Sequence, residues 1–289
     1  MYICSSMYAT LGKGGVEQRA DTQLSQGADT VPNTMSALHV PKPSSRRSGD
    51  LNGLVVFDGD DTLWMLEPLY DAARQRAGEI VGTHGLAVAD WDRLQRKIDV
   101  TNAGRMGLSA RRFPLSCVMA YQILARDSGF SPSPDAEDEI RGAANGVYDL
   151  RAPMVATAQS VLDHLRHSYR LVLLTQGEQW VQERRISDSG LADYFDAVYI
   201  VNRKTPQDFQ KVMDEIGAKP ADSWSVGNSL ASDINPALDR GMSAVWIDAA
   251  VWGYERRETV PHPGTLYAAK ELAEVPALVA QPTKQLVGV

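Results

Sequence analysis

The sequence predicts an α/β fold, with a Rossmann-like parallel sheet core and an all-helical cap domain inserted after its first strand. In the second half of the chain, apolar runs of strand length alternate with stretches of helical length, which is typical of βαβ units. Between the first apolar run and these units lies a long region with only helical patterns. Together the apolar runs predict at least five strands.

Residues 1–50 precede the first predicted strand. They are rich in Ser, Gly, Thr, Gln and Pro and show neither helical nor strand periodicity. Such a composition cannot bury enough apolar surface to offset the entropy of ordering the chain. We therefore expect a flexible leader here.

The first predicted strand, Leu54 to Phe57, ends in three acidic residues, Asp58, Asp60 and Asp61. Clustered carboxylates rarely end a buried strand unless a metal or a reaction requires them, because like charges repel each other and lose hydration. This strand end therefore indicates a metal-assisted site that handles phosphate.

The helical cap is predicted at residues 67–149. Asp90 suits an N-cap, Pro114 can open a helix, and Asp135 can start another. Apolar residues recur at helical spacing in four segments: Leu69 to Ile80, Trp91 to Ile98, Pro114 to Leu124 and Ile140 to Val147.

The sheet core is predicted at residues 51–66 and 150–275, followed by a tail at 276–289. Trp252 to Glu255 are expected to pack over the sheet edge, and Glu271 to Ala277 to form a short helix. Right-handed crossovers bring the carboxyl ends of parallel strands to one edge, where ligands of open α/β sheets bind. The later strands are expected at four apolar runs: Leu171 to Leu174, Ala197 to Val201, Trp224 to Val226 and Ala244 to Ile247.

Composition limits the classes of function. The chain of 289 residues is 44% hydrophobic and 22% charged, as in ordinary globular proteins, and its formal charge is −7. This charge argues against nucleic acid or an anionic membrane as the main partner, because both attract clustered Lys and Arg. Cys4 and Cys117 provide no disulfide framework, and no apolar run is long enough to span a bilayer. We expect a cytoplasmic protein, either a monomer or a homodimer.

Polar residues also follow the later strands. Thr175 and Gln176 come at the start of a predicted helix, where a hydroxyl and amide groups can bind an anion. Lys204 follows the next apolar run and can supply a fixed positive charge. Asn228 and Asp233 follow the third run, and their oxygens are ligands that a hard divalent cation prefers.

In this order, these residues resemble the haloacid dehalogenase (HAD) superfamily, in its phosphatase branch. The resemblance covers about residues 51–250, and the position of the helical insertion is similar to the type known in this family as a C1 cap. The motifs that carry it are Asp58-Gly59-Asp60-Asp61-Thr62, Thr175, Lys204 and the segment from Gly227 to Asp233.

The resemblance implies a role for each residue. Asp58 would attack phosphorus to form an aspartyl phosphate, and Asp60 would protonate the leaving oxygen and then activate water. Mg²⁺ would be held by Asp58, the backbone carbonyl of Asp60 and Asp233, with Asn228 as a further ligand. The phosphoryl oxygens and the loop would be supported by Thr175, Gln176, Lys204 and Thr62.

Two positions depart from the pattern of the family. Asn228 stands where an acid is usual, so the metal site has one negative charge fewer. Lys204 is followed by Thr205 and Pro206, with the proline one place later than in the common Lys-Pro pattern, so Arg203 is the alternative cation.

Within the cap, Arg105, Arg111 and Arg112 lie near a glycine-containing break between predicted helices. They are candidates to reach the site and bind substrate, and the simpler alternative is a solvated basic loop. Trp64, just after the first motif, is expected to pack at the hinge of the cap rather than to stack on substrate.

The main hypothesis is a Mg²⁺-dependent phosphatase that acts on a small phosphorylated metabolite. A hydrolytic dehalogenase shares the aspartate nucleophile and needs no metal, but Asp60 speaks against it because a departing halide needs no acid. A phosphomutase would move phosphate between sugar positions without releasing it. A third alternative is a non-catalytic binding module with the HAD fold, in which Asn228 marks the loss of activity.

Overall fold

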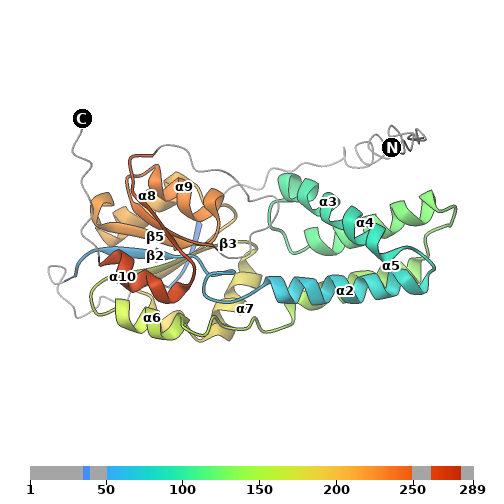
Figure 1. Cartoon of the computed structure of the whole chain (residues 1–289), viewed down its shortest axis with the longest axis horizontal. Helices are drawn as coiled ribbons and strands as arrows, with labels where there is room; N and C mark the ends of the chain where they lie inside the picture. Colours follow the sequence, from blue (N-terminus) through green and yellow to red (C-terminus); the bar gives the residue numbers. More distant parts are fainter. Residues whose placement is uncertain (1–34, 40–50, 249–261, 281–289) are drawn as a thin grey trace, which may run out of the picture. The chain divides into compact units, whose positions relative to one another are not determined.

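The computed structural model describes residues 35–39, 51–248 and 262–280. They form a seven-stranded sheet with the order β1-β4-β3-β2-β5-β6-β7 (Figure 1). β1 pairs antiparallel with β4, and every other strand pairing among the described residues is parallel. The predicted α/β class is confirmed. The strands are β1 (Met35–His39), β2 (Leu54–Phe57), β3 (Arg170–Gln176), β4 (Ala197–Val201), β5 (Ser223–Gly227), β6 (Ser243–Ile247) and β7 (Leu266–Ala269).

The direction in which strands are added to the sheet reverses at β2. From β2 the chain adds β3 and β4 on one side, and it then returns to add β5, β6 and β7 on the other. Ligands of open α/β sheets bind at such a switch point, outside the carboxyl ends of the strands. Asp58 follows β2 and Asn228 follows β5, so both residues lie at this point.

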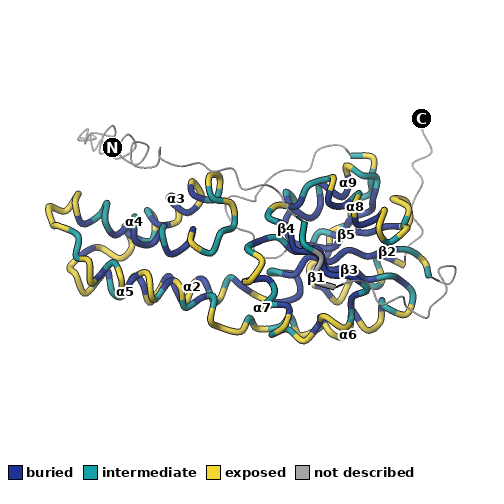
Figure 2. The backbone as a smooth tube through the Cα atoms, turned by 180° about the vertical axis from the view of Figure 1, so that it is seen from behind, coloured by how far each residue is buried: buried dark blue, intermediate teal, exposed yellow. Residues whose placement is uncertain are grey.

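Helices cover both faces of the sheet (Figure 1). Side chains of α8 and α9 join an apolar cluster with Leu54 and Val56, whereas those of α6, α7 and α10 join another with Val55 and Phe57. Because both faces are covered, all four residues of β2 are buried, and the strand is a continuous apolar run (Figure 2). The helices are α6 (Ala158–Leu165), α7 (Gln179–Ser189), α8 (Pro206–Ile216), α9 (Asn235–Leu238) and α10 (Val275–Val279).

Four helices follow β2 before the chain returns to the sheet. α3 packs against α4, and α2 packs against α5. None of the helices in the described part of the chain combines the length and the apolar character that crossing a bilayer requires. The four are α2 (Glu67–Thr83), α3 (Val88–Met106), α4 (Arg112–Asp127) and α5 (Pro134–Asn145).

Three of these helices begin earlier than the sequence predicts. α3 begins ahead of Asp90, which lies in its first turn instead of at the N-cap. α4 begins ahead of Pro114. α5 is capped by Ser133, whose side chain accepts a backbone hydrogen bond, and Asp135 lies in its first turn. Asp and Pro favour the whole first turn of a helix, so they locate its start only to within a few residues.

Two strands were not predicted. β1 lies inside the expected leader, and β7 follows the last predicted strand. Both lie at the edges of the sheet, and β7 has three residues that are not buried, so it lacks a continuous apolar run. The helix expected at Glu271 to Ala277 is a 3₁₀ turn (Leu272–Glu274) followed by α10. The rest of the leader and the segment Trp252 to Glu255 lie outside the described residues.

Phe57 is fully buried at the end of β2 and packs edge-to-face against Phe195. Replacing Phe57 with Ala is expected to lower the free energy of unfolding by about 3–5 kcal/mol, because a cavity adds to the lost transfer free energy. Urea denaturation followed by circular dichroism measures the change. Leu266→Ala on the exposed edge strand is the control, with an expected loss below about 1 kcal/mol. Equal losses would contradict this account of the core.

Candidate active site

Three charged side chains form the centre of the site. The ammonium Nζ of Lys204 lies 2.5 Å from Asp58 Oδ1 and 2.6 Å from Asp233 Oδ1. All three residues are buried, at 7% exposure or less. They follow β2, β4 and β5, so the sheet brings together residues that are far apart in the sequence. Lys204, the predicted cation, contacts both carboxylates.

One lysine balances the charge of only one of the two carboxylates. The pKa of Asp58 is raised to about 7, first by burial and then by the charge of Asp233, against the lowering effect of Lys204. Burial also opposes the charge of Lys204, but Asp233 and Asp58 hold the pKa of the ammonium above its ordinary value. Taken by themselves, the two carboxylates and the one ammonium carry a formal charge of −1, which a bound cation can offset.

The loop after β5 holds Asp233. The N–H of Ser229 donates to Asp233 Oδ2 at 2.9 Å, and the Ser225 hydroxyl donates to the Asp233 carbonyl at 2.8 Å. A Cβ on Gly227 would lie 2.3 Å from Asp233 Oδ2, so a side chain there would displace the carboxylate. Thr62 Oγ1 donates a long bond of 3.5 Å to Asn228 Oδ1, which joins this loop to the first motif.

Lys204 is placed by the start of α8. Thr205 is the N-cap and forms a capping box with Asp208, and Pro206 takes the first helical position. The later proline is thus explained, because one residue is needed to cap the helix between Lys204 and Pro206.

The first motif forms a tight turn after β2. The carbonyl of Gly59 accepts the N–H of Leu63 at 2.8 Å, and Asp61 adopts a left-handed φ of 56°. Asp61 Oδ1 accepts the N–H groups of Leu66 at 2.7 Å and Glu67 at 3.2 Å, so it caps the start of α2. Burial raises the pKa of Asp61 to about 7, although these two bonds lower it.

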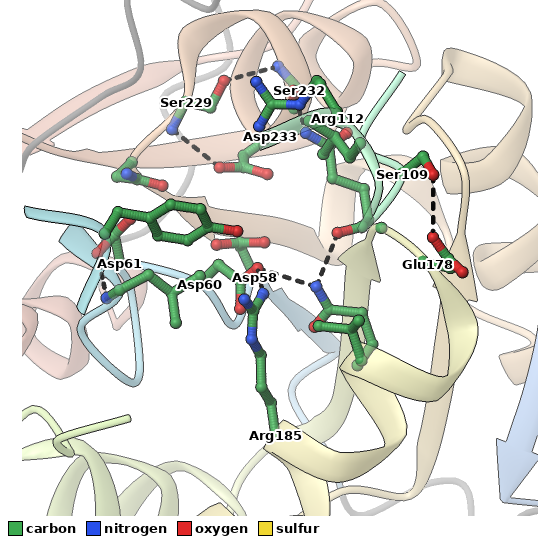
Figure 3. Close-up of a pocket in the computed structure, with 18 of the residues that line it drawn as sticks. Asp58, Asp60, Asp61, Ser109, Arg112, Glu178, Arg185, Ser229, Ser232 and Asp233 are labelled. Carbon is green, nitrogen blue, oxygen red and sulfur yellow. Dashed lines mark hydrogen bonds and ion pairs between the residues drawn. The ribbon is translucent and has the colours of Figure 1, made fainter. Parts of the chain in front are cut away.

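Asp60 is held by three donors that the sequence did not single out. Trp64 Nε1 donates to Oδ1 at 2.6 Å. Gln182 Nε2 and Arg185 Nη1 donate to Oδ2 at 2.9 and 2.7 Å. Figure 3 shows Arg185 reaching from α7 toward the acidic centre of the site. One sequence pattern could have pointed to two of these donors. Gln182 and Arg185 are polar residues three positions apart on the helix that follows Thr175, so they lie on the same face of that helix.

Thr175 is fully buried and does not line the cavity of the site. Its hydroxyl donates to Gln182 Oε1 at 3.2 Å, so it faces α7 instead of the space open to an anion. Gln176 does line the cavity, and its Nε2 donates to Ser232 Oγ at 3.1 Å. Gly177, at a φ of 144°, leaves room for Gln182, whose Nε2 would lie 2.8 Å from a Cβ.

A cavity of about 70 Å³ opens above Asp58, Asp60 and Asp233. Of the three arginines predicted to bind substrate, Arg112 lines this cavity, and Arg105 and Arg111 lie exposed outside it. Arg112 forms a buried ion pair with Asp99. The helical insertion therefore brings one of the expected arginines to the site.

The loop between α3 and α4 also contacts the sheet core. Glu178, just before α7, accepts the Ser109 hydroxyl at 3.1 Å and the N–H of Ala110 at 2.7 Å (Figure 3). A second cavity, of about 280 Å³, also borders Gln176 and is lined by Arg203 and Lys204. The insertion thus reaches the rim of the site by direct hydrogen bonds.

The side chains at the switch point fit Mg²⁺. In the described ranges no three His, Cys, Asp or Glu side chains cluster closely enough to hold a metal by themselves. Asp58 and Asp233, which line the cavity, supply two carboxylates. The Asn228 amide and the backbone carbonyl of Asp60 are the other candidate oxygen ligands. Mg²⁺ binds proteins through one or two carboxylates and keeps several waters, and it would offset the charge that raises the pKa of Asp58.

The switch-point site and the covered parallel sheet define a Rossmann-like α/β protein with an acidic site suited to an anion and a cation together. The chain belongs to the haloacid dehalogenase-like hydrolase family, whose profile matches residues 53–239. The crystal structure of a haloacid dehalogenase-like family hydrolase from Xanthomonas campestris has the same fold, with a TM-score of 0.65 and 24% identity over 80% of this chain and 96% of that one.

Curated relatives of this chain are phosphatases. N-acylneuraminate-9-phosphatase from Rattus norvegicus is 31% identical over 127 residues, which cover 42% of this chain and 50% of the relative. Glyceraldehyde 3-phosphate phosphatase from Pyrococcus furiosus is 26% identical over 198 residues, which cover 67% and 79%. This chain spans about half the length of the N-acylneuraminate-9-phosphatases that it matches.

The pKa of Asp61 makes stability depend on pH. Because the folded-state pKa lies above the unfolded one, the folded state is favoured below pH 4, and this contribution is lost as the pH rises through about 7. Asp61→Asn keeps the capping oxygen and tolerates a left-handed φ. We expect the free energy of unfolding of the variant, relative to the natural protein, to increase between pH 5 and pH 8.

Urea denaturation across this pH range tests the expectation. Asp193→Asn, which replaces an exposed acid, is the matched control and should show a constant difference. If the Asp61→Asn difference is also constant with pH, Asp61 is not the half-buried acid with a raised pKa that the structure indicates.

Proposed function

We propose that the protein is a Mg²⁺-dependent phosphatase that hydrolyses a small phosphorylated metabolite through an aspartyl phosphate. The observation that carries this proposal is the buried cluster of Asp58, Lys204 and Asp233 beside Asp60 at the switch point of the sheet. Family membership and the phosphatase relatives support it. Neither nucleic acid nor a membrane is proposed as a partner.

The proposed reaction has two displacements. In the first, a carboxylate oxygen of Asp58 bonds to phosphorus, the ester P–O bond breaks, and Asp60 gives its proton to the leaving oxygen. In the second, water attacks phosphorus, Asp60 takes a proton from that water, and the Asp58 carboxylate is released. Lys204 carries the positive charge nearest the nucleophile, and Gln176 presents polar groups to the phosphoryl oxygens.

Mg²⁺, when bound, would reduce the repulsion between the Asp58 carboxylate and the phosphate dianion. Asp58, Asp233, Asn228 and the Asp60 carbonyl are the proposed ligands. Thr62 supports the Asn228 loop. Thr175 acts through Gln182 in the observed conformation, and its contact with phosphate requires that bond to open.

The helical region at 67–149 is proposed to act as a cap on a core formed by 51–66 and 150–275. Support comes from Arg112 in the cavity and from the bonds of Glu178 to Ser109 and Ala110. Arg112 is the proposed substrate contact of the cap. A haloacid dehalogenase activity is disfavoured because a departing halide has no use for the acid that Asp60 supplies.

Asp58→Asn tests the proposal. With Mg²⁺ present, the natural protein should release phosphate from p-nitrophenyl phosphate and from members of a panel of phosphorylated metabolites. The variant should lose this activity by at least about 10³-fold, because an amide cannot form the aspartyl phosphate.

Asp193→Asn, an acid-to-amide change on the exposed surface, is the matched control and should keep full activity. Thermal unfolding of both variants verifies that each is folded. Retained turnover in Asp58→Asn would refute the mechanism, and metal-independent chloride release from 2-chloropropionate would favour the dehalogenase.

A further inference from the structure

The three donors to Asp60 are divided unequally between its two oxygens. Oδ2 accepts Gln182 Nε2 at 2.9 Å and Arg185 Nη1 at 2.7 Å, whereas Oδ1 accepts Trp64 Nε1 at 2.6 Å. A carboxylate offers about four acceptor positions, two on each oxygen. Among the described residues, Oδ2 is therefore saturated and Oδ1 keeps one open position. Asp60 also lines the cavity and is 23% exposed at its side chain, so this position can be reached.

We propose that Asp60 transfers protons through Oδ1, and that Gln182 and Arg185 are positioning residues that hold Oδ2. This inference rests on the proposed phosphatase function and adds the α7 pair to the residues of the site. As the ester P–O bond breaks, the proton on Oδ1 passes to the leaving oxygen. As the bond between Asp58 and phosphorus breaks in the second step, Oδ1 takes a proton from the attacking water.

The orientation of Gln182 is determined by its surroundings. Its Nε2 donates to the carbonyl of Gln176 at 3.0 Å as well as to Asp60, and a backbone carbonyl can only accept. The NH₂ group must therefore point at Asp60, and Oε1 accepts the hydroxyl of Thr175. Gln182 is 1% exposed, so no solvent competes for these bonds. The buried amide thus ties Asp60 to the end of β3.

Arg185 and Trp64 hold different oxygens of the Asp60 carboxylate: Arg185 binds Oδ2 and Trp64 binds Oδ1. The Arg185 side chain is 12% exposed and forms an ion pair with Asp60. The Trp64 indole packs where a Cβ on Gly59 would lie, 2.4 Å from the ring, so glycine at this position is required for its approach. With both oxygens held, the carboxylate cannot rotate to present Oδ2 to the substrate.

The substrate class follows from the need for such an acid. An aliphatic alkoxide is a strong base and leaves phosphorus poorly without a proton, whereas an aryl oxide leaves readily. A proton donor to the leaving oxygen is therefore needed only for the first kind. We therefore assign the substrates to phosphate monoesters of aliphatic alcohols.

The test compares two esters in Arg185→Met, with glycerol phosphate as the alkyl ester and p-nitrophenyl phosphate as the aryl ester. With Mg²⁺, the variant should lower kcat/KM, which reports only the steps up to departure of the alcohol, about 10- to 100-fold for glycerol phosphate and less than about threefold for p-nitrophenyl phosphate. The second displacement, in which Asp60 takes a proton from water, is the same for both esters and does not enter kcat/KM. Arg184→Met is the matched control, because Arg184 is the neighbouring arginine of α7 and pairs with Asp149 and Asp188 at the surface. It should leave both rates unchanged.

A double variant separates positioning from general damage. If Arg185 acts through Asp60, adding Arg185→Met to Asp60→Asn should cause no further loss of kcat/KM for the alkyl ester. Equal losses of kcat/KM on both esters, or additive losses in the double variant, would overturn the proposal. Should Arg185→Met fail to fold, Arg185→Lys and Gln182→Met carry the same comparison.

The outcomes also separate this inference from the proposed function. If the natural protein hydrolyses p-nitrophenyl phosphate but no alkyl ester, the phosphatase function stands and the assigned substrate class is wrong. If it hydrolyses neither ester, the proposed function fails, and the role assigned to the α7 pair fails with it.

Discussion

A single buried ammonium between two buried carboxylates is the contact on which the site depends. Lys204 follows β4 and contacts Asp58 after β2 and Asp233 after β5. The site therefore exists only while these three strands keep their places in the sheet. Removing such charges from water is costly, and losing one partner leaves the others uncompensated. The supporting loops therefore have narrow requirements: Gly227 admits Asp233, and Thr205 starts α8 directly after Lys204.

Central strands could be predicted from the sequence and edge strands could not. β2 and β4 have the predicted limits because both faces of each strand are covered, which makes every residue apolar. β1 and β7 border the sheet, and β7 has exposed residues that break the apolar run. The helix starts were displaced because Asp90 and Pro114 favour the first turn in general and do not define the N-cap.

Within the site, the predictable residues are those that follow a strand. Asp58, Lys204 and Asp233 could be grouped because each follows a parallel strand, and parallel strands end at one edge of the sheet. The direction of a side chain does not follow from that rule, which is why Thr175 was expected to face the anion but bonds to Gln182. Gln182 lies about one turn and Arg185 about two turns into α7. Their contact with Asp60 depends on how that helix docks, which no local pattern encodes.

Three acidic residues share the turn after β2, where their like charges repel each other. The turn gives each acid different partners. Asp58 faces Lys204, Asp60 faces the donors of α7, and the left-handed backbone of Asp61 directs its carboxylate to the N–H groups of α2. Gly59 makes this possible, because its carbonyl closes the turn and its missing side chain admits Trp64. The repulsion is thus reduced by separation: one acid bonds to the lysine after β4, one to α7, and one holds the helical insertion to the same turn.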